Sequence, residues 1–305
     1  MTSQARLDAA WSCARYEAAR ARLPTAAFPA ATRAIATLED LAGDVDAFAL
    51  DAFGVLNVGD APIPGAAERL ARLRAMGKRL LVLTNGATQA RAAAHAKYRA
   101  MGFDFAPEEV VASRDVAAAA LAARPGAAGM LWAAASGPAP DFSDIPLPMA
   151  DLLADPALFD RADGFVLFSA SGWSDARQAR LVAALRARPR PLVVANPDIV
   201  APRERGFTLE PGHFAHLAAD ATGVAPEFHG KPFPGAYAEV LRRLAPIPPM
   251  RIAAVGDTLH TDILGGRAAG MRTVLARDHG LFAGVDPAPF VAQSGIVPDF
   301  ALGAI

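Results

Sequence analysis

Four groups of polar residues in this sequence combine the side chains that phosphate and metal chemistry requires. They are Asp51, Thr84 with Asn85, Lys231, and Asp257 with Asp262. Carboxylates are the ligands that hard Mg²⁺ prefers. A lysine offsets phosphate charge, and a hydroxyl or loop N–H binds phosphate oxygens. These residue types together suit a divalent cation bound next to a phosphate group. A carboxylate can also attack the phosphorus atom directly.

Short apolar runs precede these groups and predict the elements that position them. Buried strands are predicted at 45–51, at 79–84 and at the start of 251–271, and helical patterns occupy 63–78 and 87–102. Strands that alternate with helices predict a parallel sheet with helices on its faces. Because the carboxyl ends of such strands line one crevice, we expect the polar groups to meet there.

The middle of the chain breaks this pattern and predicts a second domain. Strand-like runs return at 129–135 and 164–170, a helix is predicted at about 175–188, and the first pattern resumes after the stretch at 229–244. We therefore expect an α/β fold, a Rossmann-like parallel-sheet core with an inserted α/β cap domain. The expected boundaries are 1–90 for the first part of the core, 91–225 for the cap and 226–305 for the second part of the core.

The composition excludes several classes of function. The 305 residues carry a net charge of −1, which gives no support for nucleic-acid or membrane binding. The single Cys13 fits a reducing compartment, and neither a secretory signal nor an 18-residue apolar run is found, so we expect a cytoplasmic protein. An amphipathic helix at 3–22 packs on the core or on a second subunit, so the sequence allows a homodimer.

Five motifs resemble the haloacid dehalogenase superfamily of aspartate-nucleophile hydrolases. They are "LDAFGVLNVG", "PGAAERLARLRAMGKRLLVLTNGAT", "ANPD", "GKPFPGAY" and "VGDTLHTDILGGRAAGM", which occur in the family's order and span residues 45 to 275. The most similar class has a large inserted α/β cap and holds nucleotide, pyridoxal-phosphate and phosphoglycolate phosphatases. The resemblance implies a phosphatase of a small phosphorylated metabolite that uses Mg²⁺.

The resemblance also implies roles for residues of the catalytic centre. Asp51 would be the nucleophile, and Lys231 would orient it and offset phosphate charge. Thr84 would bind the transferring phosphoryl group, with Asn85 and Gly86 beside it.

Further residues would hold the metal or face the entrance. Mg²⁺ would bind to Asp51, to the backbone carbonyl of Phe53 and to Asp257, while Asp262 would support it through waters or through Lys231. In "ANPD", Asn196 and Asp198 would face the entrance of the active site.

Phe53 departs from the family pattern. Phosphatases of this family usually carry a second Asp two residues after the nucleophile, which protonates the leaving oxygen and later activates water. A phenyl ring transfers no proton, and such help is typically worth about 10²–10⁴-fold in rate. The alternatives are therefore a non-catalytic or very slow phosphometabolite-binding protein, or a dehalogenase, whose halide leaves without a proton.

Several of these residues also have a purely structural interpretation. A lone aspartate after a strand is more often a turn or helix cap, and Asp262 precedes a helical stretch. His213 and His216, at helical spacing, could bind metal or substrate but more often pack in the cap. His260 lies between Asp257 and Asp262 and would either replace the missing acid in part or point to solvent.

Overall fold

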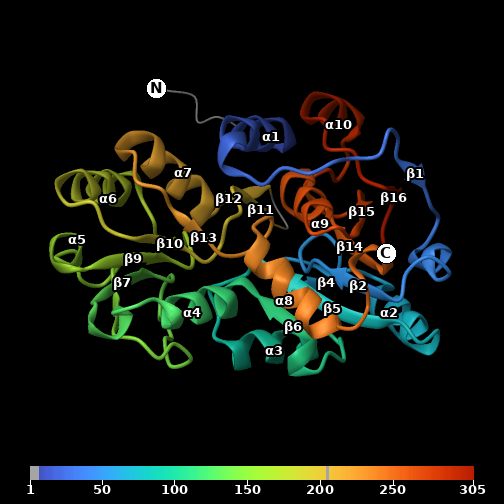
Figure 1. Cartoon of the computed structure of the whole chain (residues 1–305), viewed down its shortest axis with the longest axis horizontal. Helices are drawn as coiled ribbons and strands as arrows, with labels where there is room; N and C mark the ends of the chain where they lie inside the picture. The colour runs from blue at the N-terminus through green and yellow to red at the C-terminus, as the bar shows by residue number, and fades with distance from the viewer. Residues whose placement is uncertain (1–6, 204–205) are drawn as a thin grey trace.

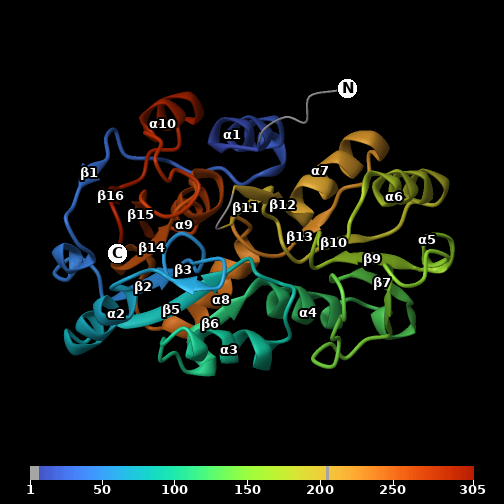
Figure 2. The same ribbon diagram turned by 180° about the vertical axis from the view of Figure 1, so that it is seen from behind.

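The computed structural model describes residues 7–203 and 206–305, which form two lobes lying side by side (Figure 1). The larger lobe contains a seven-stranded sheet from the two outer parts of the chain. The smaller lobe contains a five-stranded sheet from the middle of the chain. The view from behind shows the same division (Figure 2). The predicted α/β fold, a parallel-sheet core with an inserted α/β unit, is confirmed.

All pairings in the larger sheet are parallel, and the order of its strands locates a crevice. From edge to edge the strands are β1 (Arg33–Ala34), β16 (Phe300–Leu302), β15 (Arg272–Ala276), β14 (Ile252–Gly256), β2 (Ala47–Leu50), β5 (Arg79–Thr84) and β6 (Val110–Ala112). The chain adds β5 and β6 on one side of β2 and later adds β14 on the other. The strand order therefore reverses between β2 and β14, where a ligand crevice is expected.

Strand β2 illustrates why the core strands consist almost entirely of apolar residues. Phe48 and Leu50 pack on one face with helix α2 (Ala66–Ala75), whereas Ala47 and Ala49 pack on the other face with helix α8 (Pro234–Leu244). Helices cover both faces, so both alternating sets of side chains are buried. The other helices of this lobe are α3 (Arg91–Ala100), α9 (Leu264–Ala268), which continues a π-helical turn at Leu259–Ile263, and α10 (Ala288–Ser294).

The smaller lobe repeats the α/β plan on a smaller scale. Its parallel sheet has the order β13 (Glu227–Phe228), β10 (Leu192–Val194), β9 (Gly164–Leu167), β7 (Trp132–Ala135) and β8 (Met149–Asp151). Its helices are α4 (Ser113–Ala123), α5 (Leu158–Arg161), α6 (Asp175–Ala187) and α7 (Pro211–Thr222). Two short hairpins complete the fold, β3 (Asn57–Val58) with β4 (Ala61–Pro62), and β11 (Val200–Pro202) with β12 (Phe207–Leu209).

The insert begins later in the chain than the sequence predicts. Strand β6 pairs with β5 in the larger sheet, although the sequence analysis assigns everything from residue 91 to the cap. At the other end, β13 pairs with β10 in the smaller sheet, just beyond the expected boundary at 225. Since strand pairing defines each lobe, we propose that the insert spans residues 113–228. A strand as short as β6 has too few residues for an apolar pattern to reveal it.

Helix α1 (Ala9–Ala18) lies along the junction of the two lobes (Figures 1 and 2). The predicted helix at 3–22 is confirmed over this shorter range, and residues 3–6 lie outside the described part of the chain. Asp8 caps α1, because its carboxylate accepts a hydrogen bond from the backbone N–H of Trp11 at 2.8 Å. Trp11 also packs on His213 of α7. The helix therefore packs on this chain's own lobes, and a second subunit stays a prediction.

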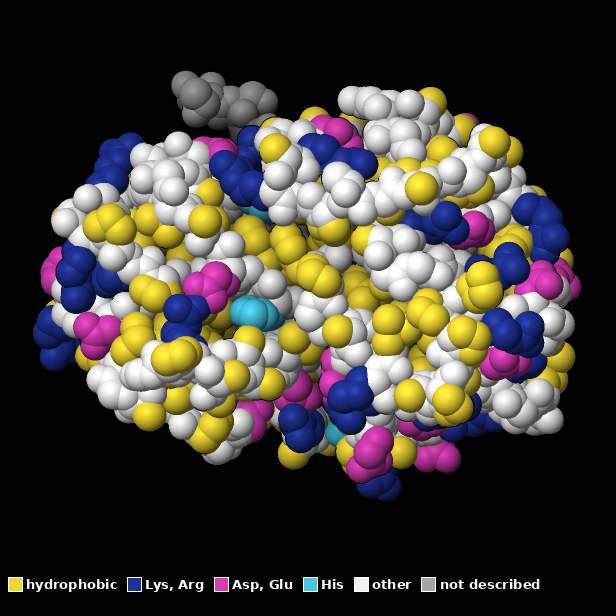
Figure 3. Space-filling view, in the orientation of Figure 1, with side chains coloured by type: hydrophobic (Ala, Val, Ile, Leu, Met, Phe, Trp, Pro, Cys, Tyr) yellow, Lys and Arg dark blue, Asp and Glu magenta, His cyan; other side chains and the backbone are white. Residues whose placement is uncertain are grey.

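The helices of the described residues and the face drawn in Figure 3 bear on membrane binding and on surface charge. In the described ranges, no helix combines the length and the apolar character needed to cross a membrane. On the face drawn in Figure 3, basic and acidic side chains are interspersed. This mixture fits the near-zero net charge of the sequence.

Tyr16→Phe should lower the melting temperature by a few degrees. The Tyr16 hydroxyl accepts a hydrogen bond from the buried backbone N–H of Ile199 at 3.1 Å, and its loss leaves that N–H unpaired. An unpaired buried donor costs about 1–3 kcal/mol. Ser12→Ala is the matched control on the same helix, because no hydrogen-bond partner for the buried Ser12 hydroxyl exists among the described residues. Equal melting temperatures for wild type and Tyr16→Phe, measured by calorimetry, would contradict this account.

Candidate active site

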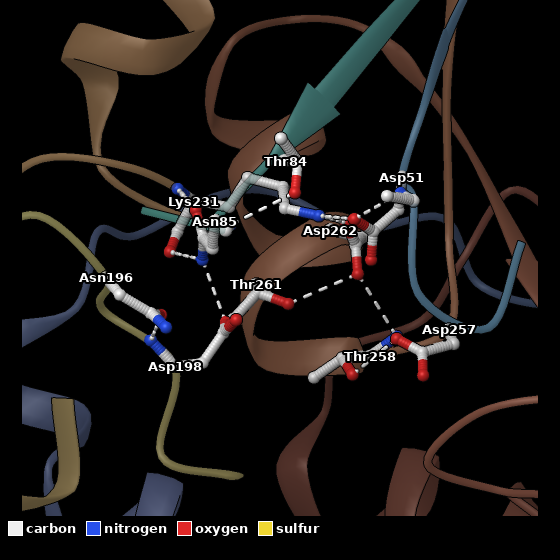
Figure 4. A network of polar contacts seen from close by, with 12 residues as sticks. Asp51, Thr84, Asn85, Asn196, Asp198, Lys231, Asp257, Thr258, Thr261 and Asp262 are labelled. Atoms are coloured by element: carbon white, nitrogen blue, oxygen red, sulfur yellow. Dashed lines mark hydrogen bonds and ion pairs between the residues drawn. The ribbon is translucent and has the colours of Figure 1, made fainter. Parts of the chain in front are cut away.

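The polar groups predicted from the sequence meet at the carboxyl ends of the central strands (Figure 4). Asp51 directly follows β2, Thr84 ends β5, and Asp257 directly follows β14. Strands β5 and β14 flank β2 in the sheet, so residues that are more than 200 positions apart in the chain become neighbours. The topology of the sheet therefore brings the polar groups together at one edge, as the sequence pattern predicts.

Lys231 is the cation at the centre of this group. Its Nζ lies 2.5 Å from Oδ1 of Asp51 and 2.7 Å from Oδ1 of Asp262, and only 2% of the residue is exposed. Burial opposes the charge on Lys231, but the carboxylates of Asp262 and Asp51 outweigh it and hold the lysine pKa well above its usual range. Lys231 is therefore a permanent positive charge under the site.

Three carboxylates lie close together at this ammonium group, which pairs directly with two of them, Asp51 and Asp262. One oxygen each from Asp51, Asp257 and Asp262 lies within 4.8 Å of the others. Burial, and after it the charge of Asp262, raise the pKa of Asp51 well above its usual range and the pKa of Asp257 to about 6. Oxygen ligands this close, with an excess of negative charge that Lys231 alone does not balance, fit a hard divalent cation.

Glycines make room for two of these carboxylates. A Cβ on Gly280 would lie 2.0 Å from Oδ2 of Asp257, and a Cβ on Gly256 would lie 1.9 Å from Cγ of Asp262. Oδ2 of Asp257 also accepts a hydrogen bond from the backbone N–H of Leu281 at 2.8 Å. The two carboxylates are therefore held in fixed places by the surrounding backbone.

The residues predicted to bind phosphate divide into two kinds. Thr84 is buried at the end of β5, and its Oγ1 accepts a hydrogen bond from the backbone N–H of Gly86 at 3.0 Å. The side chain of Asn85, in contrast, bonds both backbone groups of Lys231, at 2.7 Å and 3.0 Å, and donates to Asp198 at 2.8 Å. Asn85 therefore positions the loop that carries Lys231, and its side chain is not free to bind a ligand.

Asn196 and Asp198 lie beside this loop. The Asn196 side chain accepts a hydrogen bond from the backbone N–H of Asp198 at 3.0 Å and donates to Glu210 at 3.2 Å. Burial raises the pKa of Asp198 to about 7, although Lys231 and Asn85 act against this rise. The "ANPD" loop thus joins the smaller lobe to the loop that carries Lys231.

A pocket of about 240 Å³ opens onto this group of residues. Its lining includes all the predicted site residues except Lys231 and Asp262, namely Asp51, Phe53, Thr84, Asn85, Gly86, Asn196, Asp198 and Asp257. Lys231 and Asp262 are buried behind it. The pocket is the size of a small metabolite, and its polar residues lie where a phosphate group would contact Asp51.

The site does not include His213, His216 or His260, the three histidines considered in the sequence analysis. His260 is fully buried, stacks on Tyr16 with ring centroids 4.9 Å apart, and bonds Glu17 at 2.6 Å. It therefore neither points to solvent nor supplies the missing acid, because α1 covers it. His213 packs on Trp11 and His216 on Phe228, and burial lowers the pKa of each to about 4.

Sequence reasoning missed three charged pocket residues that come from separate elements. Lys97 lies on α3, Arg203 follows β11, and Glu210 directly precedes α7. None of them adjoins a motif, so each has the pattern of an ordinary solvated charge. Only the buried position of Glu210 and its ion pair with Arg203 at 2.8 Å distinguish them.

Known proteins resemble this chain along most of its length. Residues 48–142 match the model of the haloacid dehalogenase-like hydrolase family, and residues 228–285 match a second, HAD-hydrolase-like model. An acid sugar phosphatase of Staphylococcus aureus is 29% identical over 231 residues, which cover 75% of this chain and 85% of that protein.

Solved structures share the same fold. A possible sugar phosphatase of this superfamily from Cytophaga hutchinsonii superposes with a TM-score of 0.78 at 24% identity, covering 89% of this chain and 98% of its own. The glycerol phosphate phosphatase of Mycobacterium tuberculosis, solved in complex with calcium, gives a TM-score of 0.66 at 27% identity, covering 87% and 74%. The structure of the same Mycobacterium tuberculosis protein in complex with magnesium superposes with a TM-score of 0.65.

Asp257→Asn should weaken the binding of Mg²⁺ to the protein. Mutation of an outer partner of a metal ligand typically costs about 10–100-fold in affinity, so loss of a charged ligand oxygen should cost at least roughly tenfold. Isothermal titration with Mg²⁺ measures the effect. Asp155→Asn, a change of the same kind in the smaller lobe, is the control. An unchanged titration of Asp257→Asn would mean that the cation binds elsewhere.

Proposed function

Since the chain belongs to the haloacid dehalogenase superfamily of hydrolases, we propose that it is a Mg²⁺-dependent phosphatase of a small phosphorylated metabolite. The reaction proceeds through an aspartyl-phosphate on Asp51. The named activities of the relatives, an acid sugar phosphatase and a glycerol phosphate phosphatase, support this substrate class.

The observation that carries the proposal is the ion cluster beneath the pocket. Oδ1 of Asp51 forms an ion pair with Nζ of Lys231 at 2.5 Å and accepts a hydrogen bond from the backbone N–H of Ala52 at 2.7 Å. Within the described ranges, Oδ2 of Asp51 has no hydrogen-bond partner. A carboxylate fixed through one oxygen and open at the other is suited to attack a phosphorus atom held next to it.

The reaction has two steps. In the first, Asp51 attacks phosphorus, the bond from phosphorus to the leaving oxygen breaks, and the released alcohol takes up a proton. In the second, water attacks phosphorus, the acyl phosphate bond breaks, and inorganic phosphate leaves while Asp51 is restored. Thr84 and the N–H groups of its loop bind phosphate oxygens, and Lys231 offsets their charge in both steps.

Asp51, Asp257 and Asp262, with the backbone carbonyl of Phe53, would hold the cation. When bound, Mg²⁺ neutralises charge on the phosphoryl group and brings it against Asp51. The smaller lobe covers the pocket through Asn196, Asp198 and Arg203, and so excludes water from the first step.

A screen of phosphate esters tests the proposal. Purified protein should release inorganic phosphate from at least one member of a panel that includes p-nitrophenyl phosphate, acyl phosphates and sugar phosphates. The rate should fall when the divalent cation is removed with EDTA and recover when Mg²⁺ is added. Absence of hydrolysis across the whole panel with Mg²⁺ present would refute the proposal.

Phe53 favours a second candidate, a phosphometabolite-binding protein with very slow turnover. Its ring is half-buried and packs against the core of the larger lobe, so no carboxylate is available at the position of the usual acid. Tight binding of a phosphorylated ligand without release of phosphate would support this candidate and not the first.

Asp51→Asn should abolish turnover and leave ligand binding measurable. The amide has nearly the same shape, but it is not an effective nucleophile toward phosphorus. Phosphate release on the best substrate of the panel measures turnover, and circular dichroism verifies the fold. A variant that keeps the wild-type rate would exclude the covalent mechanism.

Phe53→Asp should raise turnover of alkyl phosphates by roughly tenfold or more, because it restores a group that protonates the leaving oxygen. Aryl and acyl phosphates expel stable anions and should gain little. Phe53→Asn is the matched control, since its side chain has the size of aspartate but transfers no proton. An equal gain for both variants would show that size, and not proton transfer, limits the wild-type enzyme.

A further inference from the structure

Two cations from different lobes flank Phe53 at the mouth of the pocket. Nζ of Lys97 and Cζ of Arg203 each lie 5.5 Å from the centroid of the Phe53 ring. Lys97 comes from α3 of the larger lobe, whereas Arg203 follows β11 beside the smaller lobe. Both side chains line the same pocket as Asp51. The mouth is therefore positively charged on two sides of an apolar ring.

The position of Arg203 is fixed by a buried acid. Its guanidinium donates to Oε1 of Glu210 at 2.8 Å and to Oγ1 of Thr208 at 2.9 Å. Glu210 is 6% exposed and also accepts the hydrogen bond from Asn196, so it links Arg203 to the loop that faces the catalytic centre. A surface arginine of no function would not require such a buried partner.

A carboxylate of the protein already pairs with one of the two cations. Oδ1 of Asp60 is 2.7 Å from Nζ of Lys97, and the Asp60 side chain is 91% exposed. The hydrogen bond and charge of Lys97, together with the charge of Arg203, lower the pKa of Asp60. An ion pair as exposed as this contributes little to stability, so another carboxylate can replace Asp60 at small cost.

We propose that Lys97 and Arg203 bind a carboxylate of the substrate whose phosphate lies beside Asp51. The inference rests on the proposed phosphatase function and narrows its substrate class to small phosphorylated acids. Arginine forms strong, directional hydrogen bonds to carboxylates, and lysine adds a point charge. Phosphatases of this family usually carry an aspartate at position 53, and its carboxylate would compete with the ligand for the two cations. The apolar ring of Phe53 does not compete for them.

A pair of ligands that differ in one group tests the proposal. Glycerol 3-phosphate and 3-phosphoglycerate share three carbons and one phosphate, and only the second carries a carboxylate. Their affinities are measured by isothermal titration on Asp51→Asn, so the comparison needs no turnover. We expect 3-phosphoglycerate to bind at least roughly tenfold more tightly, the value of one good charge-assisted hydrogen bond. Equal affinities would overturn the proposal.

Single substitutions then locate the preference. Lys97→Met and Arg203→Met keep the apolar stems, and each should reduce the preference for 3-phosphoglycerate by roughly tenfold. Asp60→Asn removes the competing carboxylate and should increase it. Arg242→Met, at an exposed arginine of α8, is the control and should leave the preference unchanged. A preference that survives both Lys97→Met and Arg203→Met would overturn the assignment.

The two hypotheses fail in distinguishable ways. If the wild-type protein hydrolyses p-nitrophenyl phosphate but Asp51→Asn binds both ligands equally, the phosphatase function stands and the carboxylate subsite is refuted. If no ester is hydrolysed but the binding preference follows Lys97 and Arg203, the subsite stands and the catalytic function is refuted.

Discussion

The ion pairs of Lys231 are the interaction on which the rest of the site depends. Removing carboxylates from water is costly, and the opposing charge of a single buried ammonium group recovers only part of that cost. Asp51 and Asp262 form ion pairs with the same Nζ, and the side chain of Asn85 bonds the backbone N–H and carbonyl of the lysine. The protein thus keeps an arrangement that burial alone disfavours. Strongly shifted pKa values in a cleft are typical of functional sites, so a function of these residues would explain why the protein keeps them buried.

The parallel sheet supplies the rigidity that this cluster needs. Neighbouring strands fix Asp51 and Asp257 by their hydrogen bonds, with Asp51 N–H donating to the carbonyl of Val255 at 2.8 Å. Strand β14, which precedes Asp257, leads through a π-helical turn into α9, and Asp262 lies on that turn. A π-turn directs its side chains differently from an α-helix and is frequent at functional sites. The turn lets Asp262 point back toward Lys231.

The sequence predicted that the buried polar residues lie together, because each of them directly follows an apolar run or belongs to a motif. Asp51 and Thr84 are examples, since the carboxyl ends of neighbouring parallel strands all lie at the same edge of the sheet. Contacts made across the lobes were not predictable in this way. Lys97 and Arg203 approach the same Phe53 ring although they lie on elements far apart in the chain, and no local pattern encodes that proximity. His260 was undecided for the same reason, because its partners on α1 lie more than 240 residues away in the chain.

Phe53 connects the chemistry of the pocket to its charge. An aspartate there would place one more negative charge near Asp51, whose environment already carries an excess of carboxylates, and would pair with Lys97. The phenyl ring removes that charge and leaves a face on which cations rest at distances typical of cation–π contacts. Loss of the proton donor is therefore accompanied by a more positive entrance. Under the proposed function, an anionic ligand would gain affinity from the same phenylalanine that leaves a poor leaving group without a proton donor, so a single residue would couple the charge of the substrate to the demand of its leaving group.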